Sequence, residues 1–140
     1  MRSDLKDITK RMRTDIIEML HAAKSGHTGG SLSATDILAV LYFDKMNIDP
    51  QRPEWPDRDR LVLAKGHAAP ALYAALALRG FFRHEDLVTL RKSFSHLQGH
   101  PNMNTTPGVD MSTGSLGQGL SVANGMALAG RLDNKDYYVY

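Results

Sequence analysis

Three of the six histidines follow a glycine directly: His27 in SGHTGG, His67 in AKGHAAP and His100 in QGHPN. A glycine before an imidazole lets the backbone pass close to a ligand while the ring points at it. A neutral imidazole can move protons, and a protonated one can hold a phosphate or an oxyanion. These side chains are candidates for such chemistry, although a single Gly-His pair is more typical of a turn with a surface histidine. The other histidines, His21, His84 and His96, are interpreted as ordinary surface residues.

The segment TGSLGQG, residues 113–119, places three glycines immediately before a small and apolar run with a helical pattern. Glycines at a helix N-terminus let unpaired backbone N–H groups face an anion or a polar ring, and the helix dipole adds to the attraction. The segment is not a Walker A loop, since no Gly-Lys-Ser/Thr follows, and its spacing does not fit GxGxxG. Close packing of the helix on a neighbour is the alternative, and both uses of the glycines stay open.

The elements that must position these residues begin with two helices. Apolar side chains three and four residues apart predict a helix over residues 3–24. A second helix is predicted after a Ser33–Asp36 capping box, and the residues expected to face inward from it are Ile37, Leu38, Leu41 and Tyr42. LVLA, residues 61–64, is predicted as a buried strand of a parallel sheet. His67 would then lie beyond the carboxyl end of that strand, where ligands bind in open α/β sheets.

The second half of the chain is predicted to contain further helices and a second strand. The run APALYAALALRG is predicted as a buried helix that stops at Gly80, and residues 84–92 as a short amphipathic helix. Residues 93–116 have no clear period and are interpreted as a functional or disordered loop. A glycine-led helix is predicted over about residues 117–131 and a strand over YYVY, residues 137–140. This order favours an α/β fold with a parallel sheet.

Composition limits the classes of protein that remain. The 140 residues, with 42% hydrophobic and 23% charged side chains, suit one globular domain over residues 1–140. Basic residues are scattered among acidic ones and the net charge is only +2, which argues against a nucleic-acid partner. The sequence has no cysteine, no apolar leader and no apolar run of ~18 residues, so we expect a cytoplasmic protein without a membrane partner.

Four stretches resemble the N-terminal part of transketolases, and more narrowly the N-terminal subunit of the split, two-gene bacterial type. They are SGHTGGSLSATDILAVLYF, DRLVLAKGHAAPALYAALALRG, LQGHP and PGVDMSTGSLGQGLSVANGMALAGRLDNKDYYVY, and together they run along nearly all of the chain. Deoxyxylulose-phosphate synthases share the architecture but have motifs that differ from AKGHAAP and QGHP. Thr28 and Ser115 stand where proline is frequent in transketolases, a difference that would alter loop stiffness without removing a reacting group.

The resemblance implies an α/β domain, in which a parallel sheet with flanking helices binds thiamine diphosphate. It implies a transferase that moves a two-carbon ketol unit between sugar phosphates, in the pentose phosphate pathway. By the resemblance, His67 is catalytic and lies against the cofactor diphosphate. His100 is catalytic and holds the hydroxyls of the transferred unit, and His27 contacts the sugar substrate. The cofactor would also be contacted by the first residues of the glycine-rich segment, Gly114, Ser115 and Leu116.

The resemblance also implies parts that this sequence does not contain. In transketolases the strand resembling YYVY continues into Gly-Asp-Gly and later an Asn, whose oxygens hold Mg²⁺, and no Gly-Asp-Gly occurs among these 140 residues. The glutamate that activates the cofactor belongs to a second domain. We therefore expect an incomplete domain without metal ligands, inactive alone, that works as a dimer or other homo- or hetero-oligomer with a C-terminal transketolase subunit or domain. A non-catalytic association module derived from the same fold is the alternative.

Overall fold

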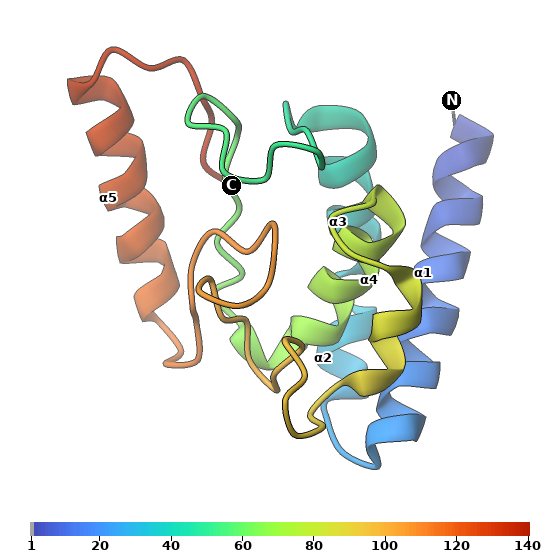
Figure 1. Cartoon of the computed structure of the whole chain (residues 1–140). Helices are drawn as coiled ribbons and strands as arrows, with labels where there is room; N and C mark the ends of the chain where they lie inside the picture. The colour runs from blue at the N-terminus through green and yellow to red at the C-terminus, as the bar shows by residue number, and fades with distance from the viewer. Residues whose placement is uncertain (1) are drawn as a thin grey trace.

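The chain folds as helices joined by long irregular segments, and a computed structural model describes it over residues 2–140. The helices are α1 (Arg2–Ala23), α2 (Thr28–Leu32), α3 (Thr35–Val40), α4 (Ala69–Arg79) and α5 (Gln118–Leu132). A π-helical turn covers Leu41–Lys45, and 3-10 turns cover Gly66–Ala68 and His84–Thr89. In Figure 1, α1, α3 and α4 lie together, whereas α5 stands apart, with irregular segments and the C-terminus between them.

Helix α4 lies at the centre of the hydrophobic core. Every residue from Ala69 to Ala77 is buried, and α1 and α3 pack against this helix. Proline is tolerated in its first turn, and the helix ends at Gly80, whose φ of 94° is a left-handed conformation that glycine adopts without steric cost. The predicted buried helix with its stop at Gly80 is therefore confirmed.

The predicted parallel strands are present only as two extended segments joined at one bridge. Arg60 donates its N–H to the Tyr138 carbonyl at 2.9 Å and accepts from the Tyr140 N–H at 2.9 Å. This parallel bridge pairs Arg60 with Val139. The prediction of full strands over LVLA and YYVY is wrong for the described residues, although the parallel direction of the pairing agrees with it.

Side chains occupy the other edge of the first extended segment, which prevents further strand pairing there. The Leu61 N–H donates to the Asp110 carboxylate at 2.7 Å, and the Leu63 carbonyl accepts from the Thr113 hydroxyl at 2.8 Å. Leu61 and Leu63 are both buried, as predicted for this run. The long loop thus substitutes for a neighbouring strand, because buried backbone groups need hydrogen-bond partners of some kind.

The Ser33–Asp36 capping box does not form. Helix α3 begins without a side-chain cap. The Ser33 hydroxyl donates instead to the Gly30 carbonyl at 3.0 Å, and the Asp36 carboxylate accepts from Arg13 of α1 at 2.7 Å. The reason is that the preceding segment is already helical, as α2, so the Ser33 side chain is close to a carbonyl at the end of that helix.

Two other predictions are corrected in the same regions. Ile37 does not face inward but is 64% exposed. The helix predicted over residues 84–92 is a 3-10 turn that ends at Thr89. It cannot continue because Arg91 takes a left-handed φ of 62° and donates its N–H to the Leu97 carbonyl at 2.9 Å.

Helix α5 packs on the two extended segments through its glycines. A methyl group placed on Gly119 would lie 2.6 Å from Cα of Ala64, and one on Gly130 would lie 2.7 Å from the ring of Tyr137. The packing use of these glycines is therefore supported. Exposed leucines of α5 include Leu120, Leu128 and Leu132. Neither α5 nor any other helix among the described residues is both long enough and apolar enough to cross a bilayer.

Candidate functional site

Two of the predicted site histidines are in contact. The imidazole rings of His27 and His67 meet edge to face, with centroids 5.1 Å apart and planes at 75°. His27 immediately precedes α2, and His67 lies in the 3-10 turn that follows the first extended segment. A methyl group placed on Gly30 would lie 3.4 Å from the His67 ring, so α2 passes beside that ring at Gly30.

A lysine joins the two segments that carry these histidines. The Lys65 ammonium donates to the Gly30 carbonyl at 2.8 Å and to the Ser33 hydroxyl at 2.8 Å. The Ser31 hydroxyl donates to the His27 carbonyl at 2.8 Å and holds the beginning of α2. Sequence reasoning missed Lys65, although its place between a buried apolar run and a Gly-His pair was a usable signal.

The glycine-rich segment is anchored to the same turn. A methyl group placed on Gly66 would lie 2.6 Å from the Thr113 carbonyl oxygen and 2.7 Å from its hydroxyl oxygen. Such an approach needs a residue without a side chain, because a Cβ essentially never comes within 3.0 Å of backbone atoms. The turn that carries His67 and the start of TGSLGQG are therefore held together.

His100 faces the glycine-rich segment from another loop. A methyl group placed on Gly114 would lie 3.7 Å from Cδ2 of the His100 ring. The buried hydroxyl of Tyr73 lies 2.8 Å from the Gln98 carbonyl and 3.2 Å from the His100 carbonyl, so it holds this loop from α4. Burial raises the pKa of Tyr73 against the opposing charge of Arg91, which keeps the hydroxyl a donor.

A small hollow lies at the start of α5. It has a volume of about 70 Å³ and is lined by residues of the glycine-rich segment and the helix: Met111, Ser112, Thr113, Gly114, Ser115, Gln118, Gly119 and Val122. Helix α5 begins after Gly117, whose φ is 91°, and no side chain caps it. The N–H groups of a first helical turn have no partner within the helix, so this end suits an anion.

The structure thus places four predicted site residues around one junction: His27, His67, His100 and Gly114. Ser115 and Leu116 follow at the entrance to α5, where both are exposed. The backbone N–H groups at the start of α5 and the exposed Leu116 side chain therefore lie at one end of this junction. No group of three or more His, Cys, Asp or Glu side chains that could hold a metal ion is found among the described residues.

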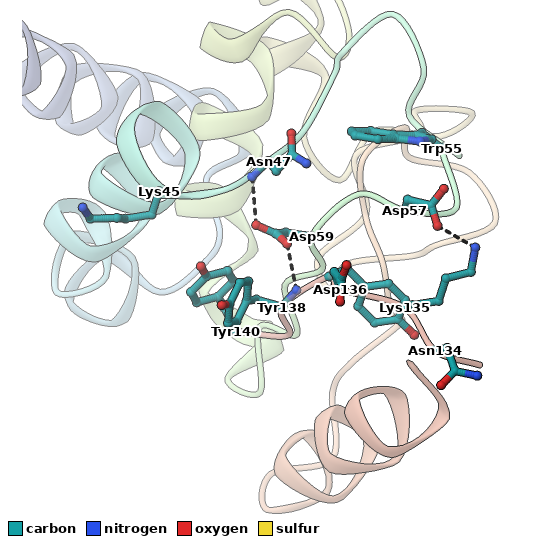
Figure 2. A pocket seen from close by; sticks show the side chains of 11 residues that line it. Lys45, Asn47, Trp55, Asp57, Asp59, Asn134, Lys135, Asp136, Tyr138 and Tyr140 are labelled. Atoms are coloured by element: carbon teal, nitrogen blue, oxygen red, sulfur yellow. Dashed lines mark hydrogen bonds and ion pairs between the residues drawn. The ribbon is translucent and has the colours of Figure 1, made fainter. Parts of the chain in front are cut away.

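A larger hollow, of about 500 Å³, lies elsewhere, beside the C-terminal segment (Figure 2). At its wall the buried Asp59 carboxylate accepts the Asn47 N–H at 2.8 Å and the Tyr138 N–H at 2.8 Å. Lys135 pairs with Asp57 at its rim, at 2.6 Å. None of the predicted site residues lines this hollow, and its contacts join distant parts of the chain.

Comparison with known proteins decides the family. Residues 5–138 match the family model described as "Transketolase, thiamine diphosphate binding domain". The chain belongs to the transketolase family. The resemblance inferred from the sequence, and the α/β class that comes with it, are confirmed, and transketolases are transferases. Within the described residues, the strand pairing is one isolated parallel bridge, between Arg60 and Val139.

Curated transketolase relatives include components of split enzymes. One, named as a subunit of the 6-deoxy-6-sulfo-D-fructose transketolase of Clostridium sp. (strain MSTE9), is 51% identical over 137 residues, which cover 98% of this chain and 50% of the relative. Another, named as a subunit of the apulose-4-phosphate transketolase of Phocaeicola vulgatus, is 43% identical over 132 residues, covering 94% and 47%. The chain therefore spans about half the length of these relatives.

Solved transketolases share the fold. The transketolase of Campylobacter jejuni superposes with a TM-score of 0.90 at 36% identity, covering 97% of this chain and 22% of that one. The transketolase of Pichia stipitis in complex with sedoheptulose 7-phosphate superposes with a TM-score of 0.86 at 35% identity, covering 98% and 22%. The transketolase fold is therefore present along almost the whole chain.

Proposed function

We propose that this chain is the N-terminal part of an enzyme that transfers a two-carbon ketol unit between sugar phosphates with thiamine diphosphate. The observation that carries the proposal is the junction at which the His27–His67 pair, the Gly66–Thr113 contact and the His100–Gly114 contact meet. These contacts connect the segments of His27, His67 and His100 with the glycine-rich segment, which leads into the uncapped start of α5. In a transketolase-family chain, they are a suitable wall for the cofactor and for the group that it carries.

The cofactor would be held by backbone groups and by one imidazole. We assign the backbone of Gly114 and Ser115, the exposed side chain of Leu116 and the ring of His67 to this task. When bound, thiamine diphosphate supplies the carbon nucleophile that accepts the ketol unit. Mg²⁺ belongs to the same proposal, in which it would offset the charge of the diphosphate. The residues described here do not supply its oxygen ligands.

The other two histidines would act on the sugar. His100 donates hydrogen bonds to the hydroxyls of the transferred unit, where preorganised donors favour the charge that develops during transfer. His27 contacts the sugar substrate, and the neighbouring His67 ring restricts its orientation. An imidazole can also accept or return a proton at each of these places.

The enzyme is proposed to be assembled from two kinds of chain or domain. Both curated relatives described above are named as subunits, and this chain spans about half of each. We propose a C-terminal transketolase subunit or domain as the partner, in a dimer or larger oligomer. A cytoplasmic location and a place in the pentose phosphate pathway complete the proposal.

The test is reconstitution of the complete subunit with its partner subunit. The mixture, supplied with thiamine diphosphate and Mg²⁺, is given a ketose phosphate and an aldose phosphate, and products are identified by mass spectrometry. We expect a new ketose phosphate that is two carbons longer than the aldose. Assembly and cofactor binding without transfer from any donor would contradict the proposal and support a non-catalytic association module.

A further inference from the structure

We propose that Lys65 is a positioning residue that fixes His27 relative to His67. The proposal rests on the proposed function, because it concerns the same two histidines. Lys65 lies two residues before His67, and its ammonium reaches across to the segment that begins at His27. It therefore connects the two segments whose rings meet at 5.1 Å.

The contacts around this ammonium form a closed set. Lys65 donates to the Gly30 carbonyl and to the Ser33 hydroxyl, each at 2.8 Å. The Ser33 hydroxyl donates in turn to the Gly30 carbonyl at 3.0 Å. Because the three groups hold one another, moving the end of α2 away from Lys65 would break two charge-assisted hydrogen bonds together.

The contacts of Lys65 lie where they can fix the position of His27 relative to His67. Helix α2 has five residues, too few to keep its shape without outside contacts, and His27 directly precedes it. Gly30 provides the carbonyl that Lys65 holds. The same residue lies beside the His67 ring, since a methyl group placed on Gly30 would be 3.4 Å from that ring. The ammonium therefore holds α2 at the residue that lies beside the His67 ring.

A lysine suits this task for two reasons. Its ammonium has three donors, so it can serve two oxygens that are not coplanar. The last carbonyls of a helix have no partner within the helix and carry partial negative charge, which a cation stabilises. Without the cation we expect the segment of His27 to drift from His67, and a displacement of about 1 Å near a reacting group can reduce the rate by about 10²-fold.

The first experiment is a double-mutant cycle in the complete subunit, reconstituted with its partner. Lys65→Met should lower kcat/KM by about tenfold or more when His27 is present. In a His27→Ala background the same change should lower it by less than about threefold, because Lys65 is proposed to act through the position of His27. Lys65→Arg should recover part of the activity, and Lys10→Met, an exposed change on α1, should have no effect. Equal Lys65→Met effects in both backgrounds would overturn the proposal, since loss of stability alone would be independent of His27.

The second experiment does not depend on activity. The ring signals of His27, assigned by their loss in His27→Ala, are recorded by NMR in the complete subunit, with the pH set so that the imidazoles are neutral. We expect Lys65→Met to shift these signals as His67→Ala does, because both changes remove the ring contact, and Lys10→Met to leave them unchanged. Unchanged His27 signals in Lys65→Met would overturn the positioning role.

The two experiments separate the two proposals. If the wild-type enzyme transfers no ketol unit, the proposed function fails, and the NMR measurement still decides the role of Lys65. If Lys65→Met does not fold, Lys65→Gln replaces it in both experiments, because the shorter amide cannot reach both oxygens and carries no charge. A shift with Lys65→Gln supports the proposal, and no shift overturns it.

Discussion

The rings of His27 and His67 meet edge to face with their centroids 5.1 Å apart, although they belong to different segments of the chain. The contact connects the entrance of α2 with the turn that leads into the buried helix α4. Because α4 is packed in the core, His67 has a rigid base, whereas His27 depends on the short α2 and its contacts for its position.

His100→Ala should lower turnover of the assembled enzyme by about a hundredfold, the size expected when one preorganised donor is lost. The control is His21→Ala, since His21 is exposed on α1 and contacts Lys24 at 3.1 Å. Steady-state kinetics of both variants is the measurement. Similar losses at the two positions would contradict our separation of site histidines from surface histidines.

Gly119→Ala and Gly125→Ala should change stability in opposite directions. A methyl group at Gly119 would lie 2.6 Å from backbone and side-chain atoms of Ala64, and overpacking of this kind costs about 1–3 kcal/mol. A methyl group at Gly125 meets nothing within 4 Å, so helix propensity should stabilise that variant by up to about 1 kcal/mol. Urea unfolding of both variants checks the prediction, and destabilisation by Gly125→Ala would show that this face of α5 is covered.

Asp110 should make the free energy of unfolding fall as pH rises above the ordinary range of aspartate. Burial raises the pKa of Asp110 in the folded chain, against the opposing charge of Arg58. The folded state then binds more protons than the unfolded state between the unfolded and folded pKa values, so this contribution is present at lower pH and lost as pH rises. The unfolding free energy of wild type minus that of Asp110→Asn should therefore decrease as pH rises from the unfolded to the folded pKa of Asp110. A difference that grows with pH would mean that the Arg58 pair dominates.

A chain of residues 1–140 alone should bind thiamine diphosphate weakly or not detectably. It has the proposed donors for the diphosphate but no Gly-Asp-Gly to supply oxygen ligands for Mg²⁺. Isothermal titration calorimetry with Mg²⁺ present is the measurement, and the complete subunit with its partner is the comparison. Micromolar affinity of residues 1–140 would show that His67 and the glycine-rich segment suffice.

The same chain of residues 1–140 should associate with itself. Leu120, Leu128 and Leu132 are exposed on α5, and Leu132 is 83% exposed, so a second copy can bury apolar surface against them. Light scattering after size exclusion, over a range of concentrations, measures the mass. Leu120→Glu with Leu128→Glu should lower that mass, whereas a wild-type monomer at all concentrations would contradict the prediction.

The sequence predicted well those features that depend on one segment. The buried helix with its stop at Gly80 and the glycine-led helix α5 follow from local periodicity and from glycine at the helix ends. Burial of the LVLA run was also predictable, because removing a run of four apolar side chains from water stabilises the folded chain. The site histidines were selected because a glycine precedes each of them, and their roles in the site stay predictions.

The predictions that failed depend on contacts between segments. Ser33 fits a capping box by spacing, but its hydroxyl bonds to Gly30 because α2 brings that carbonyl near. LVLA has the composition of a strand, but Asp110 and Thr113 occupy its second edge from a loop that has no periodic pattern. The place of Lys65 before a Gly-His pair marks it as a neighbour of the site, but its role was missed because the local sequence does not show which carbonyl its ammonium reaches.

The buried carboxylate of Asp59 sets an order of events during synthesis. It accepts hydrogen bonds from Asn47 nearby and from Tyr138, which lies 79 residues further along the chain. Until Tyr138 has left the ribosome, the extended segment beside Asp59 lacks its backbone partner, while α1, α3 and α4 can already pack together. These helices should therefore fold before the two extended segments pair, because contacts between residues far apart in the chain form with a delay.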